Sequence, residues 1–137
     1  MTVWRSARPA LAGALMMVGV TAFAQPAQGP HFAALDTMQG GQWMLRETGG
    51  QARAMCVRDP ATLFQLRSRG AGCSRFVIEN AATTATVHYT CPGRGHGRTT
   101  IAVETPRLVR IESEGIEGGA PFSVEIEARR TGACTAN

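Results

Sequence analysis

The chain contains no lysine, and all 14 of its basic residues are arginines. The arginines are scattered along the 137 residues and do not form the block of adjacent positive charges that is typical of nucleic-acid-binding segments. The basic isoelectric point of about 9.4 therefore does not predict a nucleic-acid-binding protein.

No apolar run reaches the roughly 20 residues that a membrane-spanning helix needs. The run that comes nearest covers residues 10–20, follows Arg5 and Arg8, and is succeeded by Ala22-Phe23-Ala24, which fits the small-x-small rule for signal peptidase. We expect a Sec-type signal peptide over residues 1–24 and periplasmic localisation; the alternative is a buried N-terminal helix. Cleavage leaves 137 − 24 = 113 residues with a net charge of 12 − 10 = +2, which is enough for one domain.

Common motifs of catalysis and metal binding are also missing. The cysteines form no C-x-x-C pair, and His31, His88 and His96 lack zinc-ligand spacing. No Gly-Lys-Ser/Thr sequence builds a phosphate loop, and no serine lies in a nucleophile elbow. The acidic run at 112–117 is either a calcium-binding site or the solvated end of a strand. We expect no metal, no cofactor and no catalytic residue.

Four cysteines remain after cleavage, in a compartment that permits disulfides, and they allow three connectivities. If residues 73–79 and 85–91 form a hairpin, residues whose numbers sum to 164 lie opposite, which places Cys73 against Cys91. Directly opposed Cβ atoms are about 4.5–5.5 Å apart, close to the separation of about 3.5–4.5 Å that a disulfide needs. The pairs Cys73–Cys91 and, by exclusion, Cys56–Cys134 are therefore predicted.

Alternating apolar residues and short turns predict a mainly β fold. We expect a single antiparallel meander, forming a curved sheet or a partly open small barrel, with one short helix. The helix begins at Asp59-Pro60, because Asp is a good N-cap and Pro fits the first helical position. Residues 25–34 are expected to be a flexible leader, residues 35–134 one disulfide-linked β domain, and residues 135–137 a tail.

The strands from residue 73 onward predict one buried face if Val87 pairs with Val103, Tyr89 with Ile101, and Val109 with Ile126. That register leaves Pro92–Arg98 as a loop and sets Arg110 against Glu125. The predicted face is formed by Val77, Val87, Tyr89, Ile101, Val103, Val109, Ile111, Val124 and Ile126. Phe76 and Ile78 point to the opposite, polar face, where we expect the helix or the N-terminal hairpin to bury them.

Gly41-Gln42-Trp43 at the start of the first strand, Cys56-Val57 before a Pro-led helix, and Gly132-Ala133-Cys134 near the end make an ordered pattern with Cys73 and Cys91. This pattern resembles a bacterial periplasmic family catalogued as a domain of unknown function, number 3617. The resemblance covers about residues 35–134, with Gln42 where the family usually has Leu. It implies an exported, cysteine-containing β domain and transfers no catalytic residue.

Two groups of residues are candidates for binding. Arg94, His96 and Arg98 lie in the glycine-rich segment 92–98, which is either an anion site or a flexible hairpin loop. The predicted register turns Arg75 inward, opposite Tyr89. There the arginine either extends into water at the rim of the sheet or binds the anionic head of a ligand.

These observations favour a non-catalytic periplasmic domain that binds an apolar or anionic amphiphilic ligand, or an envelope protein, on a curved sheet. The alternative is an inhibitor or accessory subunit of a periplasmic enzyme that uses the Pro92–Arg98 loop. A catalytic function is a third hypothesis. We do not expect a nucleic-acid partner. We also expect no transmembrane segment in the mature chain.

Overall fold

The structure, a computed structural model, describes residues 29–67 and 72–135. They form one seven-stranded antiparallel sheet with the order β2-β1-β7-β6-β5-β4-β3, which confirms the mainly β prediction. The strands are β1 (Gly41–Glu47), β2 (Ala52–Val57), β3 (Ser74–Asn80), β4 (Thr84–Cys91), β5 (Gly95–Thr105), β6 (Leu108–Glu117) and β7 (Ala120–Gly132). The expected signal peptide and residues 25–28 of the expected leader lie outside the described residues.

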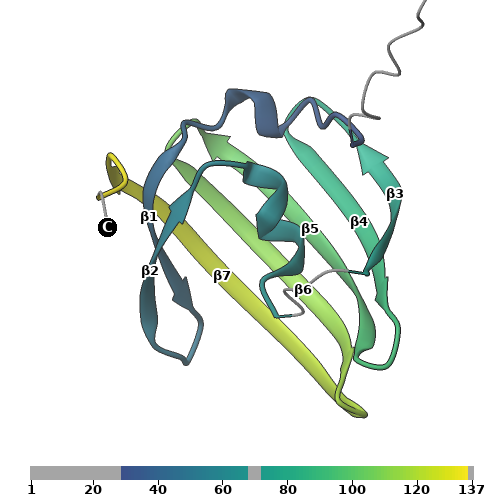
Figure 1. Cartoon of the computed structure of the whole chain (residues 1–137). Helices are drawn as coiled ribbons and strands as arrows, with labels where there is room; N and C mark the ends of the chain where they lie inside the picture. Colours follow the sequence, from purple (N-terminus) through teal and green to yellow (C-terminus); the bar gives the residue numbers. More distant parts are fainter. Residues whose placement is uncertain (1–28, 68–71, 136–137) are drawn as a thin grey trace, which may run out of the picture.

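The sheet is a meander from β3 to β7, to which the β1–β2 hairpin is added because β1 pairs with β7. Strands β2 and β3 are the two edges, so the sheet is open. It curls around the short helical segment η2 (Pro60–Gln65), which lies in front of its concave face (Figure 1). A second short segment, η1 (Leu35–Thr37), precedes β1.

The predicted helix is present as the 3-10 segment η2. The Asp59 side chain accepts a hydrogen bond from the backbone N–H of Ala61 at 2.9 Å, as an N-cap should. Leu63 and Phe64 are fully buried, and the Thr99 hydroxyl of β5 donates to the Phe64 carbonyl at 2.9 Å. Thus η2 supplies the second layer that an open sheet needs to bury its apolar face.

The core lies between the concave face and the two helical segments. Phe32 and Ala34 are buried in it, so the packed part of the chain begins before Leu35. The largest fully buried side chains are those of Trp43, Tyr89, Phe64, Leu45, Leu63, Ile101, Ile111, Val57, Val87 and Val109. Most of the predicted buried face is therefore confirmed, although Val77 and Val124 are only half-buried.

Both disulfides have the predicted connectivity. Cys73 and Cys91 have Cα atoms 4.2 Å apart and join the start of β3 to the end of β4. Cys56 and Cys134 have Cα atoms 5.3 Å apart and link β2 to the segment after β7. The described residues contain no free cysteine.

The predicted β3–β4 register is confirmed where Arg75 faces Tyr89 and Val77 faces Val87, before a register shift next to Val77. The predicted β4–β5 register is wrong by four residues: Tyr89 faces Gly97, and Val87 faces Thr99. Positive φ angles at Gly93 and Gly95 allow the chain to reverse directly after Cys91. The loop is therefore only Pro92–Arg94, and the rest of the expected loop belongs to β5.

The pairing of Ile101 with Ile111 and of Val103 with Val109 is confirmed. The predicted β6–β7 register is wrong by two residues, since Ile111 faces Ile126 and not Val124. Gly118 and Gly119 both have positive φ, the geometry of a two-residue hairpin turn, and this turn sets the register. Arg110 consequently faces Glu127 and not Glu125.

The prediction that Phe76 and Ile78 are covered is also wrong. Phe76 is 70% exposed and Ile78 is 47% exposed. Both lie on β3, which is an edge strand, while the helical segment η2 fills the concave face on the other side of the sheet (Figure 1).

Candidate functional site

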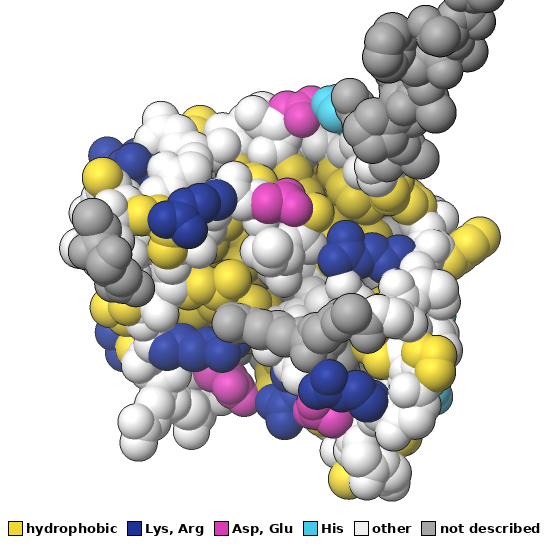
Figure 2. Space-filling view, viewed as in Figure 1, with side chains coloured by type: hydrophobic (Ala, Val, Ile, Leu, Met, Phe, Trp, Pro, Cys, Tyr) yellow, Lys and Arg dark blue, Asp and Glu magenta, His cyan; other side chains and the backbone are white. Residues whose placement is uncertain are grey.

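A small cavity opens on the concave face beside η2, between the N-terminal hairpin and β7. Its volume is about 190 Å³, and aliphatic side chains form its walls: Leu45, Leu66, Val124 and Ile126. We call this cavity the concave pocket. Figure 2 shows this face of the molecule, where hydrophobic side chains remain visible between arginine and carboxylate side chains.

The period-two alternation of the strands builds the walls. Leu45 of β1 faces Arg53 of β2 on one side and Ala128 of β7 on the other. Ile126, two residues before Ala128 on β7, is on the same face, because alternate residues of a strand share a face. Leu66 follows η2 directly and closes the pocket from above the sheet.

The rim of the concave pocket is charged. Arg67 forms an ion pair with Glu117, with Nε 3.3 Å from Oε2, and its guanidinium lies 5.0 Å from the centre of the Phe122 ring. Arg53, Glu47 and Gln51 complete the rim. Among the described residues Arg53 has no hydrogen-bond or ion-pair partner.

Arg75 and Tyr89 lie opposite each other, as predicted, but Arg75 already has an acceptor. Its Nε donates to Gln65 Oε1 at 2.9 Å, and its Nη2 donates to the same oxygen. The Tyr89 hydroxyl and Gln65 Nε2 are buried, and neither has a hydrogen-bond partner among the residues that the structure describes. The hydrogen-bonded pair of Arg75 and Gln65 therefore joins β3 to η2. Neither residue lines the concave pocket.

The structure does not bring Arg94, His96 and Arg98 together around an anion. Arg94 lies in the tight turn, where its carbonyl accepts from the N–H of Gly118 at 2.9 Å. His96 and Arg98 lie in β5 and, with His88, line an open groove of about 370 Å³. The imidazole rings of His88 and His96 stack with their centres 5.8 Å apart.

A polar groove of about 430 Å³ lies next to the tip of the N-terminal hairpin. It exposes several charged side chains, including Arg46, Arg110, Glu112, Glu125 and Glu127. Here Glu104 accepts a hydrogen bond from Arg110, which raises the pKa of Arg110 above its usual value. The side chain of Arg129 likewise donates to Glu127 at 2.7 Å and lowers the pKa of that carboxyl.

Two further findings concern the described residues 29–67 and 72–135. They contain no group of three or more His, Cys, Asp and Glu side chains that could together hold a metal ion. They also contain no helix long and apolar enough to cross a membrane. The two disulfides indicate an oxidising environment outside the cytoplasm.

The residues of the concave pocket were not among the predicted binding residues. Arg53 and Arg67 look like other surface arginines in the sequence, and nothing in the sequence pattern distinguishes Leu66 from an ordinary core residue. The alternation of Leu45 and Glu47 shows which residues share a face, but it does not show that η2 leaves a gap above them.

Comparison with known proteins finds no matching protein-family model, no similar curated protein and no similar solved structure.

Proposed function

We propose that this chain is an exported, non-catalytic binding domain of the periplasm that holds the end of a small anionic amphiphile in the concave pocket. The proposal includes a cleavable signal peptide over residues 1–24. It also includes a relationship to the exported family of unknown function, number 3617. The observation that carries it is a cavity in which four aliphatic side chains lie beside Arg53, an arginine with no hydrogen-bond or ion-pair partner among the described residues.

The two halves of the pocket suit the two halves of such a ligand. Leu66 and Val124 are half-buried and offer apolar surface to a hydrocarbon chain, whose burial contributes about 0.8 kcal/mol for each CH₂ group. Arg53 offers a guanidinium to a carboxylate, with which it can form charge-assisted hydrogen bonds. The volume of about 190 Å³ is below the range of about 300–1,000 Å³ typical of drug-sized ligands, so only a short chain or a chain end fits.

The alternative function, an inhibitor or accessory subunit that uses the Pro92–Arg98 segment, has less support. An inserting loop needs to protrude, but residues 95–98 are paired with β4 and β6. Only the turn Pro92–Arg94 remains, and its last residue is hydrogen-bonded to the neighbouring turn at Gly118.

Two measurements test the proposal. Native mass spectrometry of the protein purified from the periplasm should show a co-purifying amphiphile. Titration of the stripped protein with sodium octanoate, followed by NMR, should shift the signals of Leu45, Val124 and Ile126. Octanol, which has the same chain without the charge, should bind more weakly.

Substitutions separate the chain site from the head site. Val124→Phe should fill the concave pocket and abolish octanoate binding, whereas Arg53→Gln should weaken it by about tenfold. Arg98→Gln is the matched control, because Arg98 is not part of the pocket. Octanoate shifts that are absent, or that survive Val124→Phe unchanged, refute the proposal.

A further inference from the structure

Two side chains of opposite charge lie on the rim of the concave pocket, one on each strand of the N-terminal hairpin. They are Glu47 of β1 and Arg53 of β2. Arg53 is directly opposite Leu45, and Glu47 follows Leu45 by two residues, so all three side chains share the concave face. The two charged residues are therefore diagonal neighbours on adjacent strands, with Cα atoms about 7–8 Å apart.

The charges of this diagonal pair are not joined to each other. Among the described residues, no ion pair links Glu47 to Arg53. The ion pair on this rim is a different one, between Arg67 and Glu117. A ligand with a cation and an anion on neighbouring atoms can make charge-assisted hydrogen bonds to Glu47 and Arg53 at once. A ligand that carries only an anion is attracted by Arg53 but repelled by Glu47.

The size of the concave pocket limits the apolar part of the ligand. Its volume is about 190 Å³. An apolar cavity of about 150 Å³ is large enough to hold benzene, so this pocket suits a branched aliphatic group of a few carbon atoms. The half-buried side chains of Leu66 and Val124 provide the apolar surface for that group.

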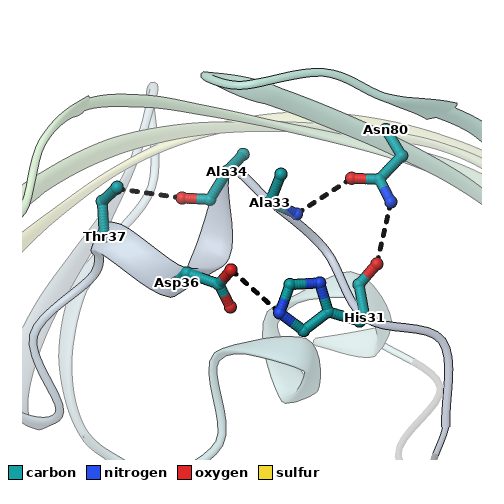
Figure 3. Close-up of polar contacts among 6 residues, drawn as sticks. All are labelled: His31, Ala33, Ala34, Asp36, Thr37 and Asn80. Atoms are coloured by element: carbon teal, nitrogen blue, oxygen red, sulfur yellow. Dashed lines mark hydrogen bonds and ion pairs between the residues drawn. The ribbon is translucent and has the colours of Figure 1, made fainter.

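Contacts at both edges of the sheet hold the walls of the pocket in place. The Asn80 side chain, at the end of β3, accepts from the N–H of Ala33 at 2.9 Å and donates to the carbonyl of His31 at 2.8 Å (Figure 3). At the other edge, Cys56 of β2 is bonded to Cys134. These contacts limit changes in the curvature of the sheet, and a preformed site loses less free energy to ordering when a small ligand binds.

We propose that the concave pocket binds a free aliphatic α-amino acid of about the size of leucine. The ligand carboxylate contacts Arg53, the ammonium contacts Glu47, and the side chain packs against Leu66 and Val124. This inference rests on the proposed function and narrows it, because the anionic head of the ligand now carries a cation on the same carbon atom. A peptide does not match the site equally well, since peptide bonds separate its ammonium from its carboxylate.

Three related ligands test the assignment of the charges in NMR titrations of the stripped protein. L-Leucine has both charged groups, isocaproate is the same molecule without the ammonium, and isoamylamine is leucine without the carboxylate. We expect leucine to bind at least about tenfold more tightly than either of the other two, because it makes one more charge-assisted contact.

Substitutions assign each charge to one side chain. Glu47→Gln should weaken leucine binding by about tenfold without weakening isocaproate binding, because isocaproate loses only a repulsion. Arg53→Gln should weaken the binding of leucine and isocaproate but not that of isoamylamine. Glu114→Gln is the matched control, an exposed carboxylate on β6 that does not line the concave pocket. Circular dichroism of each variant verifies the fold.

The possible failures separate this inference from the proposed function. Octanoate binding together with equal affinities for leucine and isocaproate would overturn the amino acid and leave the proposed function standing. An unchanged ratio of these two affinities in Glu47→Gln would do the same. Leucine binding that persists in Val124→Phe would place leucine outside the pocket and overturn the inference. Absence of binding by every ligand, octanoate included, would refute both proposals.

Discussion

The ring of Tyr89 lies against the backbone of Gly97, the residue directly opposite it on β5. A Cβ atom added to Gly97 would be 2.5 Å from the tyrosine Oη and 2.9 Å from the carbonyl oxygen of Glu114. Tyr89 is fully buried, so its ring has little room to move away. The register between β4 and β5 therefore requires glycine at position 97.

Gly97→Ala should lower the free energy of unfolding by about 1–3 kcal/mol, the usual cost of forcing extra volume into a packed site. Urea denaturation measures the difference. Gly132→Ala is the matched control, because a Cβ atom there has no neighbour within 4 Å. Equal stability of the two variants would contradict the close contact between Tyr89 and Gly97.

Thr99→Val should also destabilise the protein, by about 1–3 kcal/mol, because the buried carbonyl of Phe64 would lose its donor. Valine keeps the shape of threonine, so the loss reports the hydrogen bonds of the hydroxyl, to the Phe64 carbonyl and to the Ser113 hydroxyl at 2.8 Å, and not the packing. Thr90→Val, on the exposed part of β4, should change stability by less than about 0.5 kcal/mol. A stability of Thr99→Val equal to wild type would show that η2 is held in another way.

The two disulfides should contribute unequally to stability. Cys56 and Cys134 are 78 residues apart, whereas Cys73 and Cys91 are 18 apart. The loop-entropy model predicts losses of about 4 and 3 kcal/mol when each pair is replaced by serine. Denaturant unfolding of the two double variants checks the order. The reverse order would show that closing the longer loop is not what sets the size of the effect.

The carboxyl of Glu127 should titrate below its ordinary pKa of 4.5, because Arg129 donates to it at 2.7 Å. A lowered pKa means that the pair adds to stability above pH 4.5 and that the contribution is lost as the pH falls below that value. Carbon-detected NMR titration measures the pKa. Arg129→Gln should raise it, and high salt should weaken the effect. An unchanged pKa in Arg129→Gln would exclude Arg129 as the cause.

Local sequence patterns were sufficient for the class of fold. Alternating residues identified the strands and most of the buried face, and Asp59-Pro60 located η2. The short hairpin between Cys73 and Cys91 allowed its register and both disulfides to be predicted, because one residue spacing satisfied the apolar pattern and the thiol geometry together.

In the hairpins β4–β5 and β6–β7 the apolar pattern alone predicted the wrong strand register. Val87 and Val103 are a reasonable apolar pair. The register that pairs them does not take into account the tight turn that glycines allow after Cys91, or the space that Tyr89 needs opposite Gly97. In β6–β7, the turn at Gly118-Gly119 shifted the register by two residues without changing which residues share a face. A shift by an even number preserves the faces, so the buried set was largely right although the partners were wrong.

The sequence by itself determined the antiparallel β class, the two disulfides and the inward or outward direction of most side chains, because these depend on neighbours a few residues apart. Tertiary structure alone decided the concave pocket and the exposure of Phe76 and Ile78. Both depend on where η2 lies over the sheet, beside Leu45 and Ile126 and away from the outer face of β3. That position results from packing between residues distant in sequence, such as Phe64 and Thr99, which periodicity does not encode.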